Sequence, residues 1–267
     1  MAVILDNKNA ASPSVFRPAA LLREARRQKG LDVIDVPAVC ILDPDGDIVR
    51  RLRKERLSRP FDGWPCYHTQ LEVFELAEQT VGIVGCAVGA PFAVLVAEEL
   101  FASGCRCLVS LTSAGQIVAA GPTPYFVIID RALRDEGTSY HYATPSDYAA
   151  AEPSLVKLAT DAIAAAGRRV IVGPSWTTDA PFRETAEAIA AAKARGILAV
   201  EMEAAALYSF AQTTNASVLC LAHVTNTMAQ AEQDFEKGED DGTADALAIL
   251  AAIVGQISNQ IRNVRAL

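Results

Sequence analysis

The 267-residue sequence has little positive charge, with 24 Lys and Arg against 32 Asp and Glu and a formal net charge of -8. Nucleic-acid backbones and anionic membrane surfaces are bound mostly through Lys and Arg, so we expect neither as a partner. The sequence also lacks a CxxC pair and histidines at zinc-ligand spacing, and its six cysteines are scattered through apolar contexts. We therefore expect reduced, mostly buried thiols and no metal site.

Neither a secretory signal nor a membrane span is evident. The start, MAVILDNKNAASPS, reaches Asp6 early and has no basic region before an apolar one. The strongly apolar stretch Val81–Ala97 contains three glycines and a proline in 17 residues, fewer residues than the ~20 that cross a bilayer. A cytoplasmic location is the expectation.

Short β-branched runs alternate with Ala-rich segments in which apolar residues recur at three- and four-residue spacing. This alternation predicts an α/β protein with helices on both faces of a sheet. We expect strands at Val39–Leu42, Val81–Gly85, Cys107–Thr112, Tyr125–Asp130, Arg169–Gly173, Gly196–Val200 and Ser217–Val224. We expect helices at Ala90–Ser103, Pro153–Ala166, Pro181–Arg195, Glu203–Thr213 and Ala244–Ile261.

No repeat, heptad run or low-complexity linker divides the chain. With 51% hydrophobic residues, residues 36–267 are long enough to bury the core of one domain. Residues 1–35 contain the basic stretch REARRQKG, and we expect them to form an N-terminal extension packed on that domain. Its charges are most simply a solvated helix face.

Ligands of open α/β sheets gather at the carboxyl ends of strands, so polar residues there are candidates for a site. One strand runs into Gly82, Gly85 and Gly89 and then leads into a helix. A helix N-terminus suits phosphate, and a tight turn explains the glycines equally well. Thr112 and Ser113 end another strand, where small hydroxyl residues either form a turn or donate to an anion.

Two further strand ends are richer in functional groups. RDEGTSYHYATPSDY places His141 and Tyr142 after an apolar strand, either as a binding cluster or in a solvated loop. EMEAAALY places Glu201 and Glu203 between a buried strand and a helix start. One acid there complements the helix dipole by ~0.3–1 kcal/mol, but a pair needs polar partners. A carboxylate held there can accept two hydrogen bonds from a diol such as ribose, and Met202 offers an apolar surface to a ring.

The motifs VGAPFAVLVAEEL, TSAGQI, EGTSYHY, TTDAPFRET and EMEAAALY occur in this order between Val36 and Ile257. In these motifs the sequence resembles the nucleoside phosphorylase family, in the branch that contains uridine phosphorylase and the hexameric bacterial purine nucleoside phosphorylase. The resemblance implies a three-layer α/β/α sandwich with a central mixed, partly barrel-like β-sheet. It also implies a homo-oligomer built from dimers that often form hexamers.

The same resemblance implies roles for individual residues around the nucleoside. Glu203 would bind the ribose 2′ and 3′ hydroxyls, with Met202 under the sugar and Glu201 beside it. His141 and Tyr142 match the loop that closes around the nucleoside, His141 at the ribose and Tyr142 at the base. The other positions that would contact the base are Thr112, Ser113, Ala114, Gly115, Arg183 and Asn226.

GDIVR resembles the GDPxR phosphate loop of the family, with Ile48 in place of the proline. Gly46 and Arg50 would then contact phosphate. Ser113 falls where the family has a phosphate-binding Thr or Ser, and Arg59 lies near the place where a neighbouring subunit lends an arginine. The resemblance thus implies a phosphate site made of Gly46, Arg50, Arg59 and Ser113.

Two departures from the family pattern bear on the reaction. Ser110 stands where an arginine clamps phosphate, so a charge-assisted contact is missing unless Arg50 or Arg59 compensates. Asn226 stands where purine-specific members place an aspartic acid that protonates the purine ring. An amide cannot act as that acid, so the sequence favours a pyrimidine base.

We therefore expect a nucleoside phosphorylase-like pentosyltransferase that uses phosphate to cleave a uridine-like nucleoside into free base and pentose 1-phosphate. Arg50, Glu203 and Asn226 would be its catalytic residues. Inorganic phosphate would be a co-substrate, and no metal or organic cofactor is expected. Two alternatives stay open: a nucleosidase that uses water, which Ser110 favours, and a nucleoside-binding protein with little turnover.

Overall fold

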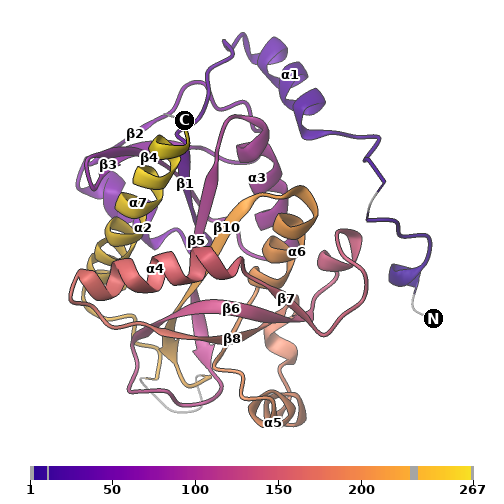
Figure 1. The fold of residues 1–267 in the computed structure, drawn as a ribbon, viewed down its shortest axis with the longest axis vertical. Coiled ribbons are helices and arrows are strands. Elements are labelled where there is room, and N and C mark those ends of the chain that lie inside the picture. The colour runs from indigo at the N-terminus through magenta and orange to yellow at the C-terminus, as the bar shows by residue number, and fades with distance from the viewer. Residues whose placement is uncertain (1–2, 11, 229–233, 266–267) are drawn as a thin grey trace.

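The structure, a computed structural model, describes residues 3–10, 12–228 and 234–265. It confirms the α/β fold with helices on both faces of the sheet that the alternating sequence pattern predicts. The strands are β1 Val39–Asp43, β2 Ser58–Pro60, β3 Glu72–Leu76, β4 Gln79–Gly85, β5 Cys107–Gln116, β6 Tyr125–Asp135, β7 Tyr148–Ala150, β8 Ile171–Thr178, β9 Ala199–Glu201 and β10 Ser217–Asn226. The α-helices are α1 Pro18–Lys29, α2 Asp47–Lys54, α3 Ala90–Ala102, α4 Pro153–Ala165, α5 Ala186–Ala194, α6 Ala204–Thr214 and α7 Thr243–Arg265 (Figure 1).

The strands form one mixed sheet in the order β10-β6-β8-β9-β5-β1-β4-β3-β2, with β7 attached to β6. Strand β10 pairs antiparallel with β6 and also parallel with β5. This second pairing closes β5, β10, β6, β8 and β9 into a ring, while β1 to β4 extend outward from it. The partly barrel-like sheet expected from the family resemblance is therefore confirmed.

Alternation along the central strands divides the core between the two faces of the sheet. Leu42 of β1 and Leu108 of β5 pack with α3 and α6. Ile41 and Val109, one position away on the same strands, pack with α2, α4 and α7 on the other face. Successive side chains of a strand point to opposite faces, so these fully apolar strands have helices on both sides. The result is the three-layer α/β/α sandwich.

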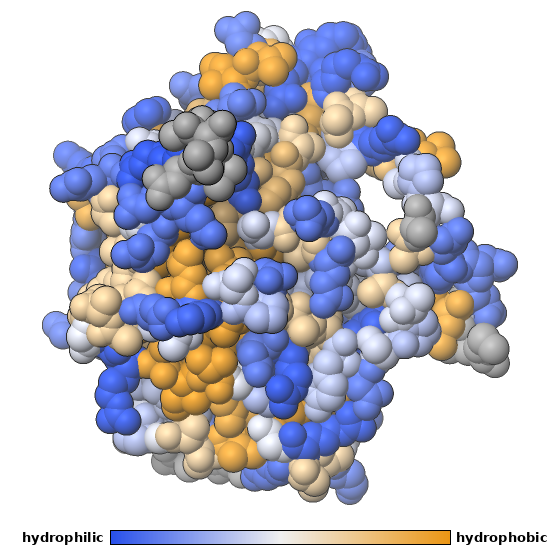
Figure 2. Space-filling view, viewed as in Figure 1, coloured by the Kyte–Doolittle hydropathy of each residue, from blue (hydrophilic) through white to orange (hydrophobic). Residues whose placement is uncertain are grey.

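Helix α7 is the longest helix in the described chain. By length and hydropathy alone, Glu239–Arg262 is suited to crossing a membrane. Ile249, Leu250, Ile253 and Val254 are nevertheless buried in the core on the α2, α4 and α7 face. Figure 2 shows further apolar side chains at the surface between α7 and α4.

Several elements differ from the sequence expectation in local detail. Helix α5 begins at Ala186 rather than Pro181, because Pro181–Arg183 form a 3-10 turn and the Thr185 hydroxyl caps the helix by accepting the Ala188 N–H at 3.3 Å. The charged helix α2 and the short strands β2, β3 and β7 lack a strong periodic signal and were not expected. The expected basic surface helix is α1, which ends at Gly30 in the left-handed conformation.

Tyr208 of α6 supplies a test of the packing between α6 and the sheet. The buried phenol donates to the Ile129 carbonyl at 2.6 Å and accepts from the Cys220 N–H at 3.0 Å. Tyr208→Phe is expected to lower the free energy of unfolding by about 1–3 kcal/mol, because both backbone groups lose a buried partner. Urea unfolding measures this change.

The matched control is Tyr67→Phe, since the Tyr67 hydroxyl is bonded to Gln28 on an exposed surface. This variant should stay within about 0.5 kcal/mol of the parent protein. Equal stability of the two variants would contradict the proposed contribution of the Tyr208 hydroxyl.

Candidate active site

Two helix N-termini meet at the carboxylate of Glu203. Glu203 is the N-cap residue of α6, and its Oε1 accepts the Gly89 N–H at 2.7 Å. Gly89, which has φ of 91°, is the N-cap residue of α3. Glu203 is only 1% exposed, and its Oε2 has no hydrogen-bond partner among the described residues. A buried oxygen without a donor is a site where a ligand hydroxyl can bind.

The neighbouring Glu201 carboxylate is, by contrast, fully engaged inside the protein. Its Oε1 accepts from the hydroxyls of Ser175 and Thr177 on β8, and its Oε2 accepts the backbone N–H groups of Glu203 and Ala204 at 2.7 Å. Burial raises the pKa of Glu201, although these donors oppose the rise. Glu201 therefore fixes the start of α6 relative to the sheet, and its oxygens have no free direction for a sugar.

Burial raises the pKa of Glu203 to about 8, and the nearby Glu201 carboxylate contributes to the same rise. The Gly89 N–H opposes it. Thr112, in the middle of β5, faces the same carboxyl group. A ligand that donates hydrogen bonds to Oε2 would stabilise the ionised form and repay part of the cost of burial.

An acidic side chain fills the position expected for phosphate. Asp45, in the loop after β1, accepts the Ser113 N–H at 2.7 Å with one oxygen and the Ser113 hydroxyl at 3.0 Å with the other. Ser113 was expected to donate these groups to phosphate. The structure thus presents a carboxylate of the chain itself at the end of β5.

The other donors of the expected phosphate loop are also engaged by the chain. The buried Asp43 accepts the N–H groups of Gly46 at 3.2 Å and Val49 at 2.9 Å, and burial raises its pKa to about 7. Arg50 donates to the Asp45 carbonyl at 2.9 Å and forms an ion pair with Asp47. Gly46, Arg50 and Ser113 therefore lie together as expected, but acidic residues take their donors.

The sequence analysis missed Asp43 and Asp45. The signal that could have found them is the acid directly before the loop glycine, in DPDGDIVR.

Asn226 and Gly115 lie side by side at the ends of β10 and β5. The Asn226 amide is used at both ends, because Oδ1 accepts the Met228 N–H at 2.9 Å and Nδ2 donates to Thr225 at 3.1 Å. A Cβ at Gly115 would lie 2.5 Å from the Met228 sulfur, so a larger residue there would require the Met228 side chain to move. Ala114, between Ser113 and Gly115, is buried in the core on the α3 and α6 face.

The remaining residues expected at the site are placed as follows. Met202 is partly exposed beside Glu203. His141 is exposed, with Nδ1 at 2.9 Å from Lys8 Nζ. Tyr142 is hydrogen-bonded to Glu98 of α3 and packs edge-on against Phe210 of α6, two turns beyond Glu203.

Arg59 on β2 and Arg183 in the 3-10 turn before α5 are exposed. The structure thus brings Thr112, Ser113, Glu203, Gly115 and Asn226 to one end of the sheet. It does not bring His141, Tyr142, Arg59 or Arg183 into contact with Glu203.

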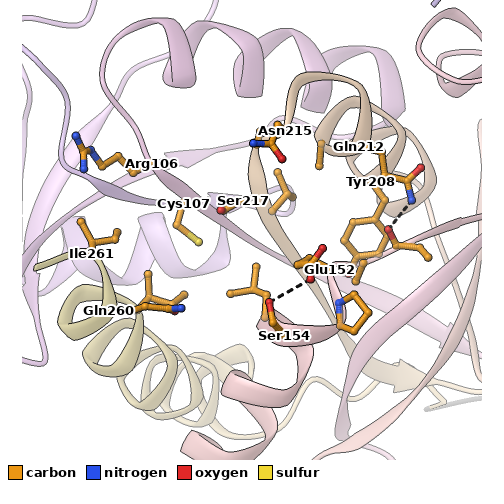
Figure 3. A pocket seen from close by; sticks show the side chains of 18 residues that line it. Arg106, Cys107, Glu152, Ser154, Tyr208, Gln212, Asn215, Ser217, Gln260 and Ile261 are labelled. Atoms are coloured by element: carbon orange, nitrogen blue, oxygen red, sulfur yellow. Dashed lines mark hydrogen bonds between the residues drawn. The ribbon is translucent and has the colours of Figure 1, made fainter. Parts of the chain in front are cut away.

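A cavity of about 820 Å³ lies at the opposite end of the sheet (Figure 3). The starts of β5 and β10, at Cys107 and Ser217, line it together with the start of α4 and the end of α7. None of the residues expected at the site lines it. The expected residues at the carboxyl ends of the strands, where such sheets generally bind ligands, therefore remain the candidate site.

No group of three or more His, Cys, Asp or Glu side chains in the described ranges is arranged to hold a metal ion.

Comparison with known proteins gives a family and a set of relatives. The model of the Phosphorylase superfamily matches residues 38–255. The DeoD-type purine nucleoside phosphorylase of Shewanella frigidimarina (strain NCIMB 400) is 27% identical over 155 residues, and that of Colwellia psychrerythraea (strain 34H / ATCC BAA-681) is 30% identical over 155 residues. Each alignment covers 57% of this chain and 66% of the relative, so the chain spans just under two thirds of their length.

Solved structures share the fold at lower sequence identity. Uridine phosphorylase from Vibrio fischeri ES114 superimposes with a TM-score of 0.70 at 20% identity, covering 84% of this chain and 95% of that one. The 5'-methylthioadenosine/S-adenosylhomocysteine nucleosidase from Neisseria meningitidis, in complex with methylthio-immucillin-A, superimposes with a TM-score of 0.66 at 20% identity and covers 82% and 99%. At this identity, the likeness establishes the fold.

The burial of Glu203 leads to a prediction about how the stability of the fold depends on pH. Its pKa is about 8 in the folded protein against an ordinary value of 4.5. The protonated Glu203 carboxyl therefore contributes fully to stability at a pH below its ordinary pKa of 4.5. This contribution is lost as the pH rises through the folded-state pKa of about 8. Glu203→Gln cannot ionise, so we expect the variant to gain stability over the parent protein between about pH 5 and pH 9.

Thermal unfolding at several pH values measures the gain, with a shift in Tm of roughly 2–4 °C for each kcal/mol. A difference in Tm that stays constant over this range would show that Glu203 does not ionise with a raised pKa.

Proposed function

Because the chain belongs to the Phosphorylase superfamily, we propose that it is an enzyme that cleaves the N-glycosidic bond of a nucleoside. The observation that carries this proposal is the buried, unpartnered Oε2 of Glu203 at the meeting point of two helix N-termini. Vicinal hydroxyls of a ribose supply the donors that this carboxylate lacks. The relatives named as nucleoside phosphorylases support the same substrate class.

The sugar is held so that charge can develop on it. Glu203 accepts the 2′ and 3′ hydroxyls, and the partly exposed Met202 beside it provides the apolar surface under the ring. As the C1′–N bond stretches, positive charge gathers on the sugar, and the Asp45 carboxylate beside Ser113 stabilises it. Glu201 acts through Glu203, as a positioning residue.

Water suits the position of the attacking nucleophile better than phosphate does. The donors of Gly46, Arg50 and Ser113 are already paired with Asp43, Asp45 and Asp47, and a phosphate dianion would face these acids. Asp45 can take a proton from water while the water oxygen bonds to C1′. The C1′–N bond then breaks, its electron pair leaves with the base, and the products are free base and pentose.

Phosphate, which the sequence analysis favoured as the nucleophile, is the second candidate here. The observation in its favour is that Gly46, Arg50 and Ser113 lie together at the ends of β1 and β5. Phosphorolysis requires Asp45 to leave the Ser113 N–H and hydroxyl, which then bind the anion. The product would be pentose 1-phosphate instead of pentose.

A pyrimidine base is the proposed leaving group. The Asn226 amide donates to Thr225 and accepts from Met228, so it cannot protonate a purine ring. Arg183 is exposed in the turn before α5 and would have to move inward to contact a uracil carbonyl. The cytoplasmic location, the homo-oligomer and the contribution of Arg59 to a neighbouring subunit stay predictions.

A test of the nucleophile compares the parent protein with Asp45→Ala. Uridine, thymidine, inosine and adenosine are each incubated with and without phosphate, and free base is measured. The parent protein is expected to release base equally under both conditions. Asp45→Ala should lose about 100-fold of this activity, because water loses its base, and should gain stimulation by phosphate, because the Ser113 donors become free.

Phosphate-dependent release by the parent protein would instead establish phosphorolysis. Ligand-induced stabilisation without release would establish a nucleoside-binding protein.

The role of Glu203 is tested by removing its carboxylate. Glu203→Ala is expected to lower kcat/KM for the preferred ribonucleoside at least about 100-fold, since two hydrogen bonds to a charged group are lost. The exposed Asp161→Asn on α4 is the matched control and should leave kcat/KM unchanged. The loss should largely disappear with the 2′,3′-dideoxy form of the same nucleoside; an equal loss on both forms would overturn the diol assignment.

A further inference from the structure

Cleavage of an N-glycosidic bond leaves an electron pair on the departing base, and the base leaves faster if a proton reaches it. Asn226, at the end of β10, cannot supply this proton because it is an amide. Thr112 and Ser113 are alcohols, and Asp45 is assigned to the opposite task of accepting a proton. The proposed reaction therefore lacks an acid among the residues discussed so far.

A cavity of about 630 Å³ lies next to the Asn226 end of the sheet. Met228 connects the two regions, because its N–H donates to Asn226, its sulfur lies over Gly115 and its side chain lines the cavity. The opposite wall comes from the segment before α5 and from α5 itself. Its described members are Pro181, Phe182, Glu184, Ala186, Ile189, Ala190 and Lys193.

Glu184 is the one carboxyl group among these lining residues. It is half-buried, and no hydrogen bond or ion pair to it is present in the described part of the chain. Burial raises its pKa to about 7, so a substantial fraction carries a proton at neutral pH. The charged groups around it are Lys193 across the cavity, the preceding Arg183, and Glu187 on the first turn of α5.

Phe182 supplies an aromatic surface at the same place. Its side chain is 99% exposed, so the ring is open to a ligand. A planar base can stack on such a ring and thereby remove its apolar surface from water. An acid, an aromatic ring and a thioether thus surround one cavity at the end of the sheet where the base is released.

We propose that Glu184 is the general acid that protonates the departing base. The inference rests on the proposed function. It gives the segment before α5 a catalytic role and makes Asn226 a positioning residue that holds Met228 against Gly115.

The step balances without a further reactant. The C1′–N bond breaks, and its electron pair passes to the base. The Glu184 carboxyl proton moves to a nitrogen or carbonyl oxygen of the base, leaving the carboxylate. The water oxygen forms the new bond to C1′, and one water proton passes to Asp45. Exchange with solvent returns a proton to Glu184 and removes one from Asp45, so the net reaction consumes one water.

The decisive experiment varies the leaving group. The substrates are the nucleoside that the parent protein cleaves fastest and 4-nitrophenyl β-D-ribofuranoside, whose leaving group departs as a stable anion without protonation. Glu184→Gln is expected to lower kcat for the nucleoside by about 100-fold and to leave kcat for the nitrophenyl riboside within about threefold. The exposed Glu187→Gln, three residues further on, is the matched control and should cleave both substrates at the parental rate.

The pH profile gives a second readout. Activity of the parent protein on the nucleoside should fall as pH rises through about 7, since the acid form is lost, and this decrease should be weaker in Glu184→Gln. Glu203 and Asp43 also titrate near this range and contribute to the profile of both proteins.

Equal loss on both substrates, or no loss on the nucleoside, overturns the role of Glu184 while the proposed function stands. If the parent protein cleaves neither substrate, the proposed function itself fails, and the inference fails with it.

Discussion

Four hydrogen bonds to the buried carboxylate of Glu201 hold the site in place. Two come from hydroxyls on β8 and two from the first backbone N–H groups of α6, so one side chain joins strand and helix. Because these bonds fix where α6 begins, they also fix Glu203, which caps the helix and receives the N–H that precedes α3. A buried charge is costly, and these hydrogen bonds offset part of that cost. They also fix the next carboxylate, Glu203, with one oxygen free.

The acidic residues at the end of β1 set the character of the rest of the site. In a loop of this shape, backbone N–H groups are free to bind an anion, but Asp43 and Asp45 already accept from Gly46, Val49 and Ser113. The loop thus has the form of an anion-binding site, and the anions that it binds are the carboxylates of Asp43 and Asp45. Ser113, which the sequence resemblance assigned to phosphate, instead holds Asp45, the proposed general base.

Much of the fold follows from local sequence patterns. The strands at Val39, Cys107 and Ser217 are continuous apolar runs, and such runs are predictable because both of their faces are buried. The acidic pair at Glu201 and Glu203 was also visible, because acids at the end of a buried strand need partners. Which of the two would be satisfied inside the protein depended on hydroxyls of β8, distant in sequence, and no local pattern encodes that.

The same limit explains the residues that sequence reasoning placed differently. Tyr142 belongs to a motif that the sequence analysis assigned to the site, yet its hydroxyl is hydrogen-bonded to Glu98 of α3. Asp45 contacts Ser113 across 68 positions of the chain, a partnership that only the pairing of β1 with β5 creates.

That partnership also gives the site a constant ionic composition. In the proposed hydrolysis the substrate is a nucleoside without net charge, and the anion beside it is the Asp45 carboxylate of the chain itself, so substrate entry is expected neither to take up nor to release counterions. Under the proposed function, we therefore expect substrate binding to depend only weakly on ionic strength.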